Sequence, residues 1–167
     1  LADKHSWIKS CYVPEEKVLF QHIYELVQGH GCAFSIADPE ALVFRELLTL
    51  ESTFTAFHGM PVAKERRYFI KEGRVVCHHP YWIEEAIEQG YSEPSLPGDW
   101  KIQLAKLNKE SGPEVKYLTR LAERLTIPGS WSVDFAHLAS KQTHDWVLID
   151  MALAYRSWHP GCPKLDE

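Results

Sequence analysis

Two aspartates near the C-terminal end of the chain have the residue type and spacing of a metal site. Asp134 and Asp150 lie in segments 130–137 and 145–152, which are rich in the β-branched and aromatic residues that favour strands. The polar segment 139–144 is typical of a turn, so we predict a β-hairpin. A symmetric fold places the aspartates opposite each other on one face. Opposed carboxylates repel, and a divalent cation between them would reverse that effect. The alternative is a slipped register or a loop that separates them.

The other face of this hairpin is predicted to be apolar. Strand alternation assigns to it six hydrophobic residues: Trp131, Val133, Phe135, Val147, Ile149 and Met151.

Two neighbouring arginines precede this hairpin in a second one. Segments 64–70 and 74–78 flank Gly73, which is typical of a hairpin turn. Alternation places Arg67 on one face with Glu65 and Phe69, and Arg66 on the other with Tyr68 and Ile70. Arginine suits phosphate because its fork of donors matches the oxygens, although a cross-strand ion pair is the alternative for either arginine. We predict that Arg67, and not Arg66, lies on the face of the two aspartates.

Two further groups of candidate residues are weaker. Lys4, His5 and Lys9 form a short basic cluster, which either reaches over an anion or belongs to a solvated terminal segment. Zinc-ligand types occur at Cys77, His78, His79, His159 and Cys162. Structural zinc sites usually show two tight ligand pairs, and here only one such pair is present, so zinc is the less favoured interpretation.

The remaining elements alternate between helices and short strands. Hydrophobic spacing predicts helices over 15–29, 83–89, 100–109 and 114–127, a strand over 42–48, and a partly buried loop over 49–63. Gly29 and Gly31 are expected to end the first helix. The last helix has one apolar face, made of Val115, Leu118, Leu121, Ala122 and Leu125. Segment 90–99 is predicted to be a linker, and the tail from 155 to be irregular.

Composition bounds the class of protein. The chain has 167 residues, 45% of them hydrophobic and 25% charged, which is ordinary globular composition. A net charge of -5 argues against a primary nucleic-acid surface. No apolar run reaches membrane-spanning length, and no signal peptide is visible. The four scattered cysteines are interpreted as reduced thiols, which predicts a cytoplasmic protein.

The order of these parts resembles the C-terminal half of ATP-grasp enzymes, and most closely a divergent clade found in phage and bacterial genomes. The similarity rests on four short motifs and the two aspartate strands. The motifs are Lys4-His5-Ser-Trp7, Arg45-Glu46, Glu65-Arg66-Arg67 and Tyr81-Trp82. The resemblance implies an α+β fold with a mostly antiparallel sheet and helices packed on one side. It also implies that residues 1–167 form the C-terminal domain and that an N-terminal lobe is missing from this chain.

The resemblance implies a set of site residues and a reaction. Backbone groups of a hinge at Arg45, Glu46, Leu47 and Leu48 would take adenine, and Glu65 the ribose. Lys4 and Arg67 would meet phosphates, with Arg67 as the catalytic residue. Asp134 and Asp150 would hold Mg²⁺. The family's usual reaction is an ATP-dependent ligation of a carboxylate to an amine through an acyl phosphate.

The chain departs from the family pattern at two positions. Asp150 stands where glutamate is usual, and Ala152 where asparagine is common. Two hypotheses follow: an ATP- and Mg²⁺-dependent ligase or its C-terminal part, and a non-catalytic α+β binding domain that has kept the fold and lost the chemistry.

Overall fold

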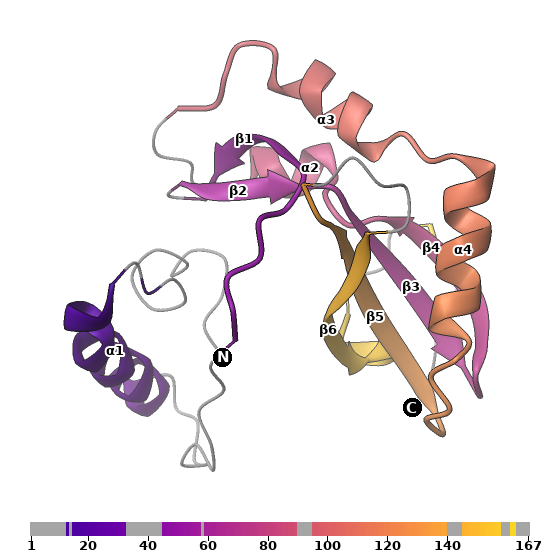
Figure 1. The fold of residues 1–167 in the computed structure, drawn as a ribbon, viewed down its shortest axis with the longest axis horizontal. Coiled ribbons are helices and arrows are strands. Elements are labelled where there is room, and N and C mark those ends of the chain that lie inside the picture. The colour runs from indigo at the N-terminus through magenta and orange to yellow at the C-terminus, as the bar shows by residue number, and fades with distance from the viewer. Residues whose placement is uncertain are drawn as a thin grey trace. The chain divides into compact units, whose positions relative to one another are not determined.

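The computed structural model describes residues 13, 15–32, 45–57, 59–89, 95–139, 145–157 and 161–162, and the chain forms two compact units. The first unit comprises Leu1–Leu47, Phe54–Pro61 and Glu85–Gly98. The second comprises Leu48–Thr53, Val62–Glu84 and Asp99–Glu167, and it carries most of the elements in Figure 1.

The predicted N-terminal helix is present but longer than expected. A 3₁₀ turn, Glu16–Val18, leads into helix α1, Leu19–Cys32. The helix continues through Gly29 and Gly31, so their prediction as its end is wrong. Glycine weakens a helix by about 1 kcal/mol, and it ends one only where the backbone turns left-handed.

The segment predicted as a loop over 49–63 is a hairpin instead. Strand β1, Ser52–Ala56, pairs with strand β2, Met60–Ala63. Phe57 and Gly59 in the connection have φ of 48° and 92°, which closes the chain tightly. Phe54 and Phe57 are buried as predicted, at 7% and 2% exposure, which explains why this segment is not a solvated loop.

The strand predicted over 42–48 is wrong for residues 45–48, which are exposed and have no regular structure. Residues 42–44 lie outside the described residues. Pairing of this segment begins later: the carbonyl of Thr49 accepts a hydrogen bond from Ala139 (2.9 Å), and Leu50 bridges Leu138. The segment from Thr49 onward thus reaches a strand partner, whereas the exposed residues before it do not.

A four-stranded antiparallel sheet with the order β4-β3-β5-β6 forms the body of the second unit. Its strands are β3 (Glu65–Lys71), β4 (Arg74–Pro80), β5 (Ser130–His137) and β6 (Trp146–Leu153). Strands β3 and β4 form the predicted hairpin, in which Glu72 and Gly73 both have positive φ (48° and 73°). Two such residues in a two-residue loop match the twist of the flanking strands.

Helices cover one face of this sheet. Helix α3 (Trp100–Asn108) precedes helix α4 (Gly112–Ala122), which lies along the sheet in Figure 1. Helix α4 ends at Ala122 rather than at residue 127, because Pro128 disfavours helical backbone before it. The core under α4 consists of Tyr68, Ile70, Leu118, Ala122, Val133, Phe135 and Trp146. The predicted α+β class, antiparallel sheet and one-sided helices are therefore confirmed.

Strand β6 enters this core in a different phase from the one predicted. The register between β5 and β6 shifts after Asp134, so that Phe135 pairs with Leu148. This β-bulge turns Trp146 inward, with 6% exposure, and leaves Val147 only half-buried. Met151 packs against the core as predicted.

A disulfide joins Cys77 on β4 to Cys162, 85 residues further along the chain. The prediction of reduced thiols is therefore wrong for this pair. Alternation spaced along the sequence cannot reveal such a contact, because the fold brings the tail back to β4. Cys11 and the side chain of Cys32 lie outside what is described. A cross-link over so long a loop typically stabilises a fold by about 2–4 kcal/mol.

Helices of membrane-spanning length and hydrophobicity do not occur among the described residues.

Candidate functional site

Four polar side chains form a row across the face of the sheet that the helices do not cover. The registers pair His79 with Arg67, Arg67 with Asp134, and Asp134 with Asp150, one residue from each strand. Residues directly opposite each other on adjacent strands share a face of the sheet. The predicted placement of the two aspartates opposite each other is therefore confirmed, as is the separation of Arg67 from Arg66.

Arg67 binds Asp134 through two parallel hydrogen bonds. Its Nε donates to Oδ1 and its Nη2 donates to Oδ2, each over 2.7 Å. The side chains are 13% and 4% exposed, so the pair is almost fully removed from solvent. Such fork-to-fork pairs are among the stronger polar contacts in proteins. The repulsion expected between the two aspartates is thus offset by a guanidinium within the sheet.

The two carboxylates have very different surroundings. Asp134 is buried, and desolvation raises its pKa, while the hydrogen bonds from Arg67 oppose that shift. Asp150 is exposed, and its Oδ1 accepts a hydrogen bond from the backbone N–H of Met151 at 2.9 Å. Of the two carboxylates, Asp150 is therefore the one that meets solvent.

Tyr81 covers the guanidinium of Arg67. The centre of its ring lies 4.6 Å from Cζ of Arg67, which is a cation–π distance. Burial raises the pKa of Tyr81 to about 12, so the phenol stays protonated at neutral pH. Tyr81 belongs to a motif noted in the sequence, but nothing there assigns it this contact.

His79 ends the row and was not predicted as a site residue. Its Nδ1 lies 2.7 Å from the carbonyl of Pro80 and must donate to it, which leaves Nε2 as the unprotonated nitrogen. Burial lowers the pKa of His79, which favours this neutral form. A hairpin closed symmetrically at Gly73 would pair Arg67 with His78. The bulge at Val76 shifts that pairing by one residue, so the hairpin pattern alone selects the wrong histidine.

The other predicted site residues are distributed as follows. Glu65 is buried (7% exposed) on β3, two residues from Arg67 and on the same face. Arg45, Glu46 and Leu47 belong to the first unit and Leu48 to the second, and all four are exposed. Lys4 lies outside the described residues.

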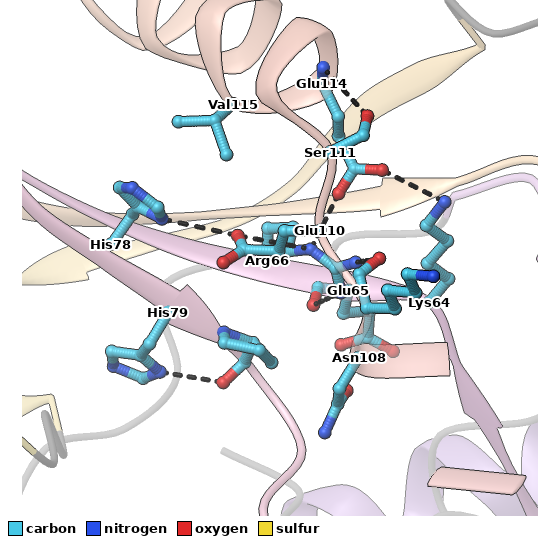
Figure 2. A network of polar contacts seen from close by, with 12 residues as sticks. Lys64, Glu65, Arg66, His78, His79, Asn108, Glu110, Ser111, Glu114 and Val115 are labelled. Atoms are coloured by element: carbon cyan, nitrogen blue, oxygen red, sulfur yellow. Dashed lines mark hydrogen bonds and ion pairs between the residues drawn. The ribbon is translucent and has the colours of Figure 1, made fainter. Parts of the chain in front are cut away.

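The opposite face of the sheet holds a separate polar network around Arg66. Its guanidinium is fully buried, and Nε lies 2.9 Å from Oε1 of Glu114. Lys64 lies 3.0 Å from the other oxygen of Glu114, and His78 lies 3.3 Å from Glu110. Figure 2 shows these residues between strand β3 and the start of helix α4, with His79 pointing away from them. This network holds the helices to the sheet and is not part of the row.

The residues of the row fit a divalent cation that is shared with a ligand. Two carboxylates and one guanidinium leave one net negative charge, with His79 neutral. No group of three or more histidine, cysteine, aspartate or glutamate side chains suited to a metal occurs in the described part of the chain. Two of the cysteines considered for zinc are instead joined to each other. Mg²⁺ is commonly held by one or two carboxylates together with phosphate oxygens, which matches this donor set.

Comparison with known proteins supports a single family. Residues 2–167 match the model of a family described as an ATP-grasp domain, the third family of its clade. Searches of curated proteins and of solved structures gave no match. ATP-grasp domains bind nucleotide and are typically parts of ATP-dependent ligases. Because the match spans nearly the whole chain and agrees with the α+β fold, this chain belongs to that family of ATP-grasp domains.

Proposed function

We propose that this domain binds ATP with Mg²⁺ and serves an ATP-dependent ligase that joins a carboxylate to an amine. The observation that carries the proposal is the row of Arg67, Asp134 and Asp150 across one face of the sheet. It combines a phosphate-binding group with two carboxylates suited to Mg²⁺. Family membership supports nucleotide binding at this face.

Each predicted site residue has a part in this proposal. The hinge at Arg45, Glu46, Leu47 and Leu48 takes the adenine through backbone groups, and Glu65 takes the ribose. Lys4 and Arg67 take phosphates. Asp134 and Asp150 hold Mg²⁺, which neutralises phosphate charge when bound. The burial of Glu65 beside Arg67 supports a ligand that runs along β3.

In the proposed reaction a substrate carboxylate attacks the γ-phosphorus of ATP, and ADP leaves. The amine then attacks the acyl carbon of the resulting acyl phosphate, and inorganic phosphate leaves as the amide bond forms. Arg67 contributes by orienting the phosphoryl group and by balancing its charge in a site with little solvent. We propose an N-terminal lobe as the partner that completes the ATP site, and the cytoplasm as the compartment.

A non-catalytic nucleotide-binding domain is the second candidate. It is favoured by Ala152, which places a methyl group two residues from Asp150, where a polar ligand would assist a second metal. Ser132 lies opposite Ala152, but its hydroxyl is 2.5 Å from the hydroxyl of Ser157. Product formation by the full-length protein separates the candidates: the ligase makes ADP and phosphate in the presence of an acceptor, and the binding domain makes neither.

The test of nucleotide binding is Asp150→Asn, which keeps the size of the side chain and removes its charge. Calorimetric titration of a non-hydrolysable ATP analogue, with Mg²⁺, is expected to show about tenfold weaker binding than the wild type. The melting temperature should stay the same or rise slightly, since one of two opposed charges is gone.

Asp145→Asn is the matched control, because Asp145 lies just before the same strand and about 16 Å away along it. It should leave the affinity unchanged. Equal affinities for wild type and Asp150→Asn would remove Asp150 from the site. Absence of any binding by the wild type in Mg²⁺ would contradict the proposed function itself.

A further inference from the structure

We propose that Arg67 keeps Asp134 closed to divalent cations in the nucleotide-free domain, and that nucleotide phosphate opens it by drawing Arg67 away. The inference rests on the proposed function and adds an order to it: the carboxylate and the phosphate compete for one guanidinium. Metal and nucleotide then bind cooperatively rather than independently.

The geometry leaves Asp134 little capacity for a second partner. Both of its oxygens accept hydrogen bonds from Arg67 at 2.7 Å, and only 4% of its side chain is exposed. A cation that uses either oxygen at coordination distance must displace at least one of the two donors, or approach a guanidinium closely. Asp150 alone is a poor site for Mg²⁺, which gives up its water reluctantly for a single exposed carboxylate.

The charges of the row act in the same direction. With Arg67 in place the row carries one net negative charge, and without it the row would carry two. A divalent cation beside Asp134 would also face the positive charge of Arg67 in a poorly solvated setting, where repulsion is weakly screened. Arg67 therefore disfavours the metal both by occupying the oxygens and by its charge.

Phosphate offers Arg67 an equivalent partner. A phosphate group accepts the same paired hydrogen bonds as a carboxylate, so the exchange replaces one fork-to-fork contact with another. Tyr81 supports the guanidinium plane from a distance of 4.6 Å and does not use its N–H donors, so this contact need not break during the exchange. Once Arg67 turns to phosphate, Asp134 regains two anionic oxygens for the metal.

The consequence is a reciprocal coupling. If nucleotide raises the affinity for the metal, the metal must raise the affinity for nucleotide by the same factor. Removing Arg67 should abolish most of this coupling, because Asp134 is then open whether or not nucleotide is present.

The test uses Arg67→Met, which keeps the aliphatic stem and removes the charge. Mn²⁺ serves as the probe, because electron paramagnetic resonance counts the free ion directly. Without nucleotide, the variant is expected to bind Mn²⁺ about tenfold more tightly than the wild type. In the presence of Mg²⁺ it should bind the ATP analogue about tenfold more weakly. These opposite signs distinguish a blocking residue from one that only supports the fold, since lost structure would weaken both.

Arg74→Met is the control, an exposed arginine on neighbouring β4 that should change neither affinity. Arg67→Met binding Mn²⁺ no better than the wild type would overturn the inference, while binding of the Mg²⁺–nucleotide by the wild type would still support the proposed function. Loss of the latter binding in the wild type would instead contradict the proposed function.

A measurement on the wild type keeps the inference testable if the variant does not fold. The Nε–H resonance of Arg67 reports its hydrogen bond to Asp134. It should move on addition of the ATP analogue with Mg²⁺ and stay in place with Mg²⁺ alone. Equal movement with Mg²⁺ alone would show that the cation displaces Arg67 unaided, and the proposed order would be wrong.

Discussion

Arg66→Met is expected to lower the free energy of unfolding by about 3–5 kcal/mol, since it leaves buried charges without their partner. Arg66 has no solvent exposure and lies 2.9 Å from Glu114 and 3.5 Å from Glu110. It also donates to the carbonyls of Leu107 and Lys109, each over 3.2 Å. These carbonyls stand at the end of helix α3, where the backbone needs donors from outside the helix. One residue thus ties both helices to the sheet (Figure 2).

Urea unfolding followed by circular dichroism measures this effect. Arg74→Met, which removes an exposed arginine, should change stability by less than about 0.5 kcal/mol. The double variant Arg66→Met with Glu114→Gln should lose less than the sum of the single losses, because the two groups are coupled. A single variant Arg66→Met as stable as the wild type would mean that this network does not hold the helices.

Asp134→Asn is expected to weaken binding of the Mg²⁺–nucleotide about 100-fold, the upper end of losses seen when a group that supports a metal is replaced. Asp134 is the buried carboxylate of the row, and asparagine preserves its shape without its charge. Arg67 loses its anionic partner and becomes available to phosphate at once. The affinity that remains should therefore depend little on Mg²⁺.

Calorimetry with and without Mg²⁺ measures both parts of this result. Asp145→Asn should behave as the wild type in each condition. Unchanged affinity of Asp134→Asn in Mg²⁺ would exclude Asp134 as a metal ligand. A variant that bound weakly but kept the full Mg²⁺ dependence would place the metal elsewhere.

The parts of the site that the sequence could predict are local. Asp134 and Asp150 lie on two strands joined by a short connection, so alternation and the length of that connection determine which residues face each other. The separation of Arg66 from Arg67 follows from alternation alone. Both predictions hold because they depend on neighbours in the chain.

The pairing of Arg67 with Asp134 could not be predicted in this way. The residues are 67 positions apart, and their strands become neighbours only after three helices intervene. Their contact is set by how the hairpins pack in the sheet. The disulfide between Cys77 and Cys162 escaped prediction for the same reason.

Bulges explain the remaining differences. An extra residue at Val76 brings His79 rather than His78 opposite Arg67, and the bulge after Asp134 turns Trp146 rather than Val147 into the core. A strict period of two cannot anticipate such insertions. The polar and apolar residues remain separated between the two faces, but the individual residue at each position changes.

The most direct measurement of the central claim is anomalous diffraction from crystals grown with Mn²⁺ and a non-hydrolysable ATP analogue. The account predicts one Mn²⁺ peak within about 2 Å of a carboxylate oxygen of both Asp134 and Asp150, with phosphate oxygens completing its coordination. It also predicts that the guanidinium of Arg67 contacts phosphate instead of Asp134. A nucleotide bound with Arg67 still paired to Asp134 and the metal away from both aspartates would contradict it.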